Sequence, residues 1–157
     1  MARQPKAPPD AWQMALRLLT RRDYGSRELA ARLSQRGCPR EEIEKALERL
    51  QELDYIDDDR YARHLAGRLV NEGRAWGGRL RLELKQRGIT GHLAEEAAAD
   101  AENKAEATAL VRDLARRRYS GFDYDSATDR ERRRVVHFFQ RRGFPLELIL
   151  AALRRPD

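Results

Sequence analysis

Three consecutive aspartates, Asp57, Asp58 and Asp59, are the residues of this chain best suited to metal chemistry. Clustered carboxylates hold Mg²⁺ in many proteins, usually beside the phosphates of a substrate. The same residues also suit the start of a helix, where carboxylates accept hydrogen bonds from free amides and oppose the helix dipole. Because no second acidic cluster with ligand spacing occurs in the sequence, we favour the helix cap and expect no bound metal.

The other reactive residues lack the neighbours that catalysis would require. Each histidine stands apart from any second histidine or cysteine at zinc-ligand spacing. The single cysteine, Cys38, has no partner for an intramolecular disulfide, which fits a reducing compartment. The glycine-bearing segment 73–78 lacks the lysine of a phosphate-binding loop. We therefore expect no enzyme activity, no cofactor and a cytoplasmic location.

Basic residues offer a different chemistry, which is the recognition of anions. The formal net charge is +6, and residues 102–157 carry 13 basic and 9 acidic groups. Arginine binds carboxylate and phosphate groups in a bidentate manner. We expect partner contacts from the two arginine triplets, while an ordinary solvated surface remains the alternative that charge alone leaves open. The triplets are Arg116, Arg117, Arg118 and Arg132, Arg133, Arg134.

Four further residues are candidates for partner binding: Arg74, Trp76, Arg79 and Arg142. Trp76 could anchor a partner, but packing between repeats is the favoured interpretation. Arg142 is one of three arginines that precede a turn glycine, where a base can interact with the carbonyl end of a helix. A base repeated along one edge of a helical array would also form a positive stripe for a nucleoprotein partner.

The elements that position these residues form an internal repeat. The sequences RGCP, RGIT and RGFP place Gly37, Gly88 and Gly143 at intervals of about 50 residues. Glycine after a run of helix formers supplies the left-handed conformation that ends a helix. The following proline or threonine can begin the next helix. Each copy is therefore predicted to be a helix, a glycine turn and a second helix.

Apolar residues recur at fixed distances on both sides of each glycine, at spacings of three and four that share one helix face. We expect these residues to form the core. Before the glycines they are Leu29 and Leu33, Leu80 and Leu84, Val135 and Phe139; after the glycines they are Ile43 and Ala46, Ala94 and Ala97, Ile149 and Ala152. The alternation in residues 79–84 would suit a strand, but alignment with the other copies favours a helix.

The predicted fold is all-α, with three tandem three-helix repeats. We expect a flexible lead-in over residues 1–9 and repeats over 10–56, 57–101 and 102–157. Asp10 and Ser26 are expected helix caps, and Thr128 with Glu131 forms a capping-box pattern. Extra residues near 120–126 indicate a loop in the third repeat.

The chain resembles the RecX family of bacterial recombination regulators, most specifically from Leu53 to Ala62, which reads LDYIDDDRYA. This resemblance implies an elongated, curved array of three-helix repeats. It also implies that the protein binds the RecA nucleoprotein filament and modulates, chiefly by inhibition, its assembly, strand exchange and coprotease activity. The residues that match the family pattern, with mainly structural roles, are Asp57, Asp58, Arg60, Tyr61, Ala62, Gly73 and Gly88.

We expect a monomer that makes no membrane contact and binds single- or double-stranded DNA only weakly. A helical protein that acts directly on DNA is the alternative, because helix–turn–helix pairs with basic edges also suit DNA.

The repeated apolar positions are predicted to be buried, and substitution can test this. Changing Leu33, Leu84 or Phe139 to Asp should each destabilise the protein by several kcal/mol, because each variant buries an unpaired charge. Thermal unfolding followed by circular dichroism measures the effect, and unchanged melting in all three variants would mean that the apolar stripes are misread.

Overall fold

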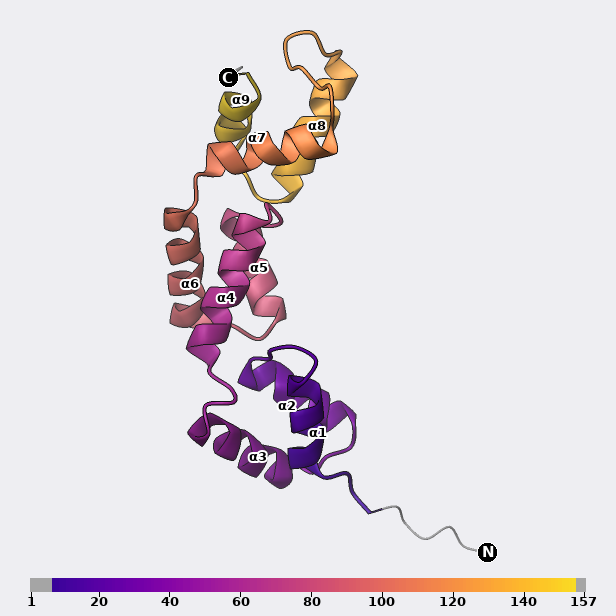
Figure 1. Cartoon of the computed structure of the whole chain (residues 1–157), viewed down its shortest axis with the longest axis vertical. Coiled ribbons are helices and arrows are strands. Elements are labelled where there is room, and N and C mark those ends of the chain that lie inside the picture. Colours follow the sequence, from indigo (N-terminus) through magenta and orange to yellow (C-terminus); the bar gives the residue numbers. More distant parts are fainter. Residues whose placement is uncertain (1–6, 155–157) are drawn as a thin grey trace, which may run out of the picture. The chain divides into compact units, whose positions relative to one another are not determined.

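The computed structural model describes residues 7–154, and within that range it consists of nine α-helices without strands (Figure 1). The helices are α1 (Ala11–Leu19), α2 (Ser26–Gln35), α3 (Arg40–Glu52), α4 (Asp58–Asn71), α5 (Gly77–Gln86), α6 (Gly91–Lys104), α7 (Ala107–Arg118), α8 (Asp129–Arg141) and α9 (Leu146–Arg154). The all-α fold of three-helix repeats is confirmed, and residues 79–84 are helical. Residues 1–6 of the expected lead-in lie outside the described range.

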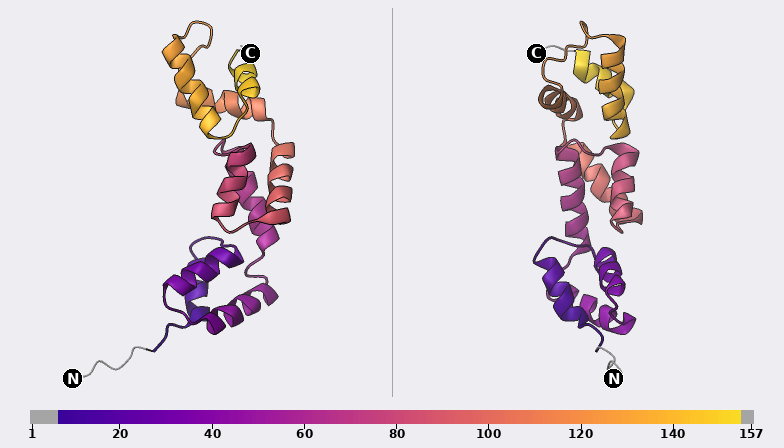
Figure 2. Two further views of the ribbon diagram at one scale, coloured as in Figure 1. Left: turned by 180° about the vertical axis from the view of Figure 1, so that it is seen from behind. Right: turned by 90° about the vertical axis from the view of Figure 1, so that its right-hand side faces the viewer.

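The chain forms two compact units. One contains the residues up to Tyr61 together with Arg87–Ile89, and the other contains Ala62–Gln86 and the residues from Thr90 onward. Helix α4 therefore begins in the first unit and continues in the second. In the first unit α1, α2 and α3 pack on one another. In the second unit α5 packs on α6, and α9 packs on both α7 and α8 (Figure 2).

The apolar positions around the three glycines are all buried. The exposed fraction is zero for Leu33, Leu84 and Phe139 and stays below one tenth for every other residue of that set. Cys38, Ile89 and Phe144, which follow the glycines, are buried as well, and burial raises the pKa of the Cys38 thiol. Leu53, the residue directly after α3, is 49% exposed.

Helix starts follow the expected chemistry at two of three positions. The Asp10 carboxylate accepts hydrogen bonds from the amides of Trp12 and Gln13, and Thr128 with Glu131 forms a complete capping box. The prediction for Ser26 is wrong. Ser26 is the first residue of α2 rather than its cap, and its hydroxyl and amide both donate to Asp58.

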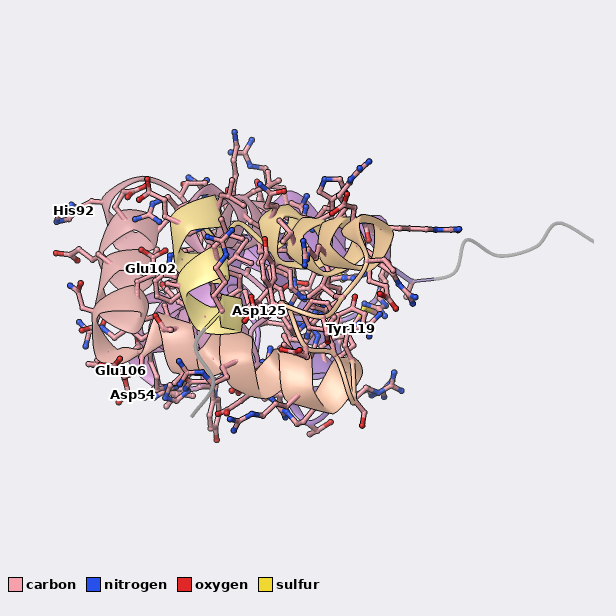
Figure 3. The ribbon with its side chains drawn as sticks, turned by 90° about the horizontal axis from the view of Figure 1, so that it is seen from above. Asp54, His92, Glu102, Glu106, Tyr119 and Asp125 are labelled. Carbon is pink, nitrogen blue, oxygen red and sulfur yellow. The ribbon has the colours of Figure 1, made fainter. Side chains whose placement is uncertain are left out.

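Glu102, expected to open the third repeat, lies within α6, which continues to Lys104. An ion pair between Lys104 and Asp100, one helical turn apart, supports this last turn. The Glu102 side chain (labelled in Figure 3) accepts a hydrogen bond of 2.8 Å from the amide of Gly77 at the start of α5. It also pairs with Arg81 at 3.1 Å. Glu102 therefore caps the N-terminus of α5 from α6.

The three turn glycines have φ angles of +84°, +79° and +95°, in the left-handed region as predicted. Their surroundings differ. A Cβ atom on Gly37 would meet nothing within 4 Å, whereas one on Gly88 would lie 2.9 Å from Cβ of Arg27. At Gly143 it would lie 2.1 Å from the carbonyl oxygen of Trp76. Gly88 and Gly143 are thus also required for a close contact with the start of the second helix of the preceding repeat.

This difference separates the two roles of the glycine. Gly37→Ala should lower the free energy of unfolding by about 1–2 kcal/mol, the cost of a left-handed non-glycine residue. Gly143→Ala should lower it by at least about 3 kcal/mol, because the methyl group must also displace the backbone at Trp76. Urea unfolding of both variants measures the gap, and equal losses would contradict the close contact.

Candidate partner-binding surface

The acidic part of the family-like segment stabilises helix starts. The carboxylate of Asp57 accepts a hydrogen bond of 3.1 Å from the amide of Arg60, as expected for the cap of α4. Asp58 instead accepts from the amide of Ser26 at 2.7 Å and from the Ser26 hydroxyl, so it caps α2 from a distant point in the sequence. Within residues 7–154, no group of three His, Cys, Asp or Glu side chains is arranged to hold a metal ion.

Tyr61 completes this attachment of α4 to α2. Its hydroxyl donates to Glu28 at 3.3 Å, and its ring lies against Gly25, where a Cβ atom would come within 3.1 Å. Glu28 also pairs with Arg22, and this hydrogen bond raises the pKa of the Arg22 guanidinium. The contacts of Asp58 and Tyr61 therefore hold the start of α4 on α2 within the first unit.

The remaining residues of the family pattern also have structural contacts. The Arg60 guanidinium donates to the carbonyl of Asp54 at 3.3 Å, beside a left-handed turn in which Asp54 has a φ of +57°. Ala62 is fully buried. Gly73 has a φ of +64° and approaches Leu114 so closely that a Cβ atom would lie 2.9 Å from its Cδ2.

The arginine triplet of α8 divides into two roles. Arg132 is half-buried, and its guanidinium donates to the carbonyls of Tyr124 at 2.8 Å and Asp125 at 2.9 Å. Arg154 lies over the ring of the same tyrosine at 5.0 Å, so the extra loop of the third repeat is held from both α8 and α9. Arg133 and Arg134 have exposed side chains. Arg132 thus orders the loop, a role that the charge pattern did not predict.

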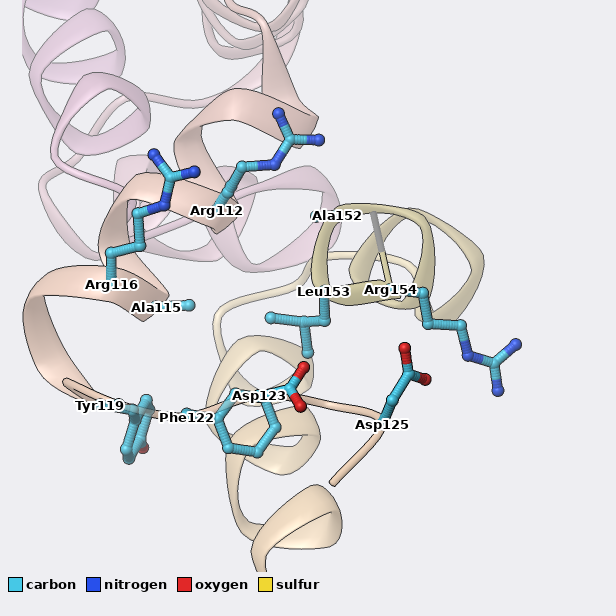
Figure 4. Close-up of a pocket in the computed structure, with 11 residues that line it drawn as sticks. Arg112, Ala115, Arg116, Tyr119, Phe122, Asp123, Asp125, Ala152, Leu153 and Arg154 are labelled. Atoms are coloured by element: carbon cyan, nitrogen blue, oxygen red, sulfur yellow. The ribbon is translucent and has the colours of Figure 1, made fainter. Parts of the chain in front are cut away.

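The triplet of α7 also faces several directions. Arg116 lines a cavity of about 260 Å³ between α7, the loop and α9 (Figure 4). Asp123 and Asp125 line the same cavity, which therefore carries charges of both signs. Arg117 is exposed and donates to the carbonyl of Asp113 at 3.4 Å. Arg118 turns toward α8 instead.

Three predicted arginines meet on two aromatic rings, and we call this set the arginine–aromatic cluster: Arg118, Tyr119, Arg134, Phe138 and Arg142. The rings of Tyr119 and Phe138 lie edge to face with centroids 5.6 Å apart. The guanidinium carbons of Arg118 and Arg142 lie 4.6 Å and 3.8 Å from the Phe138 centroid. Arg134 lies 5.7 Å from the centroid of Tyr119. Such cation–π contacts stabilise and orient the charged groups.

Sequence reasoning missed the aromatic half of this cluster. Arg134, Phe138 and Arg142 follow one another at intervals of four residues, the spacing that puts side chains on one helix face. That spacing was a usable signal, but the approach of Arg118 from α7 depends on tertiary packing.

Arg142 is the most constrained member of the cluster. Its Nε atom is buried, and no hydrogen-bond acceptor among residues 7–154 reaches it. Burial lowers the pKa of the guanidinium, and the charges of Arg118, Arg141 and Arg74 lower it further. Its guanidinium therefore lies over the Phe138 ring. The sequence had suggested a different role, an interaction with the carbonyl end of α8.

Trp76, which is partly buried, packs on a residue of the third repeat, in line with the favoured interpretation of packing between repeats. Its ring stacks on Phe144, with centroids 5.5 Å apart and an interplanar angle of 21°, and its amide donates to the carbonyl of Arg142 at 2.8 Å. Arg74 and Arg79 line a cleft of about 370 Å³ together with Leu69, Glu83, Arg141 and Arg142. The structure thus brings Arg74, Arg79 and Arg142 together at one cleft.

Comparison with known proteins points to one family. A model of the first three-helix domain of RecX matches residues 11–50, and a model of its third three-helix domain matches residues 105–153. No helix within the described range has the length and apolar character needed to cross a membrane.

Similar proteins carry the same family name. The regulatory protein RecX of Syntrophotalea carbinolica is 42% identical over 135 residues, which cover 86% of this chain and 88% of the relative. The regulatory protein RecX of Trichlorobacter lovleyi is 39% identical over 142 residues, which cover 90% and 92%. The crystal structure of RecX from Lactobacillus salivarius shares the fold, with a TM-score of 0.71 at 20% identity over 90% of this chain and 91% of that one.

The two roles within the α8 triplet can be separated by substitution. Arg132→Gln should lower the free energy of unfolding by about 1–2 kcal/mol, because two carbonyl oxygens of the loop lose their charged donor. Arg133→Gln removes the same charge from an exposed position and should change stability by less than about 0.5 kcal/mol. Urea unfolding compares them, and equal stability of the two variants would contradict the anchoring role of Arg132.

Proposed function

The chain belongs to the RecX family, and on that premise we propose that it binds the filament of the RecA recombinase and inhibits its assembly, strand exchange and coprotease activity. The curated relatives are regulatory proteins by name, which supports a regulatory role without catalysis. In this proposal the protein acts as a cytoplasmic monomer built from three repeats, near residues 10–56, 57–101 and 102–157.

The observation that carries the proposed contact is the arginine–aromatic cluster. No ion pair joins Arg118, Arg134 or Arg142 to a carboxylate of the described chain. Aromatic rings orient these groups while leaving their charge uncompensated. Partly ordered side chains lose less conformational entropy on binding, and their charge remains available to an anionic partner.

A RecA filament on DNA presents phosphates and acidic side chains, so the cluster would attract it over long distances. Attraction of this kind raises the association rate more than it strengthens the final complex. The exposed bases Arg116, Arg117 and Arg133 add to the same field, whereas Arg132 is occupied by the loop. We therefore assign most of the electrostatic contribution to the third repeat.

Direct DNA binding is the competing function, since the same arginines would suit phosphates. It predicts binding to bare single-stranded DNA with a steep salt dependence and without RecA. RecA-dependent binding requires the assembled filament. The two functions are therefore distinguished by comparing RecA filaments with bare DNA of the same sequence.

Association kinetics test the proposed surface. The double variant Arg118→Gln/Arg134→Gln should associate with RecA filaments about three- to tenfold more slowly at low salt, and its rate should depend less on salt. The matched control is Arg17→Gln/Arg32→Gln, which removes two exposed charges from the first repeat and should have a smaller effect. Stopped-flow mixing at two salt concentrations measures the association rates of both variants.

Two results would count against the proposal. If the Arg118/Arg134 variant associates as fast as the unmodified protein at both salt concentrations, the cluster is not the electrostatic surface. If the unmodified protein binds bare single-stranded DNA as tightly as the filament, direct DNA binding replaces filament binding as the function.

A further inference from the structure

The cleft beside Arg142 concentrates positive charge without an acidic counterpart for that residue. Its walls come from α4, α5 and the connection between them, and from the end of α8 with the turn that follows. Two carboxylates lie near it, but both are engaged with other arginines. Glu83 pairs with Arg79 one helical turn away, and Glu72 lies 3.5 Å from Arg74. Neither of these ion pairs neutralises Arg142.

The position of Arg142 is fixed by packing rather than by an anion. Its guanidinium carbon lies 3.8 Å from the centroid of Phe138, and its backbone carbonyl accepts a hydrogen bond from the Trp76 amide. The next residue is the turn glycine, Gly143, which lies against the Trp76 backbone. A buried guanidinium nitrogen without an acceptor is unfavourable, and like charges nearby add to the cost. An anionic group in the cleft would relieve the electrostatic part of this cost.

We infer that this cleft receives the carboxylate of an acidic side chain from a protein partner. The cleft is a discrete hollow of about 370 Å³, large enough for one side chain. The buried side chain of Leu69 forms an apolar part of its wall, suited to the methylene groups of a glutamate. A discrete hollow for one side chain beside an apolar wall does not suit a continuous chain of phosphates, which disfavours nucleic acid as the occupant.

This inference rests on the proposed function only for the identity of the partner, because the preference of the cleft for carboxylates can be measured without RecA. The Trp76 amide donates a hydrogen bond to the Arg142 carbonyl, so the fluorescence of Trp76 serves as an internal reporter for the cleft. The variant Trp12→Phe removes the other tryptophan, which lies in the first repeat. Decaglutamate and decathymidylate are then titrated against this reporter protein at low salt.

Decaglutamate should give a saturable change in Trp76 fluorescence. Adding Arg142→Gln should weaken this binding by at least about fivefold, because a charge-assisted contact is lost. Adding Arg130→Gln, which removes an exposed charge from the opposite end of α8, should change it by less than about twofold. If Arg142→Gln fails to fold, Arg141→Gln provides the test, since this exposed residue lines the cleft and should weaken binding by about threefold.

Each alternative outcome overturns the inference. Equal binding of decaglutamate to the Arg142 or Arg141 variant and the reporter protein would exclude the cleft. Arg142-dependent binding of decathymidylate that is as tight as that of decaglutamate would assign the cleft to nucleic-acid phosphate. If the reporter protein, with Arg142 intact, binds RecA filaments but not decaglutamate, only this inference is refuted. If it binds decaglutamate but not RecA filaments, the proposed function is refuted.

Discussion

The close contact between a turn glycine and the start of a preceding helix organises each repeat junction described above. Gly88 lies against Arg27 at the start of α2, and Gly143 lies against Trp76 just before α5. A Cβ atom on Gly37, the turn glycine of the first repeat, would meet nothing within 4 Å. Backbones can approach this closely only where no side chain intervenes. The amides at these helix starts are satisfied by carboxylates from elsewhere, Asp58 for α2 and Glu102 for α5. Glycine turns and distant caps therefore act together in joining one repeat to its neighbour.

The same contact determines where the functional candidates lie. Arg142 directly precedes Gly143, so the junction that seats the glycine on Trp76 also fixes the backbone of Arg142. Its side chain then reaches Phe138, which Arg118 approaches from α7. Rings occupy the place that carboxylates usually take beside arginine. A cluster built in this way retains its positive charge, and that retained charge makes it suitable for an anionic partner.

Arginines of this chain that look alike in the sequence have unlike environments. Arg132 and Arg133 are neighbours, yet one holds a loop through two carbonyl oxygens and the other is exposed. Arg116 lines a cavity shared with aspartates, while Arg118 stacks on Phe138. The excess of basic residues in the last third predicts partner contacts in that part of the chain. It could not identify which guanidinium groups are already engaged by the protein itself.

The local pattern by itself determined the helices, the glycine turns and the buried positions from Leu29 to Ala152, because helix periodicity and left-handed turns depend on residues close in sequence. It also identified Asp10 and the Thr128–Glu131 box as caps, since both act within one helical turn. Only the tertiary structure decided that Asp58 caps α2, that Glu102 belongs to α6 and caps α5, and that Leu53 is exposed. It likewise decided that Arg118 and Arg142 share one ring. These outcomes depend on groups that are distant in sequence and meet only after the helices have packed.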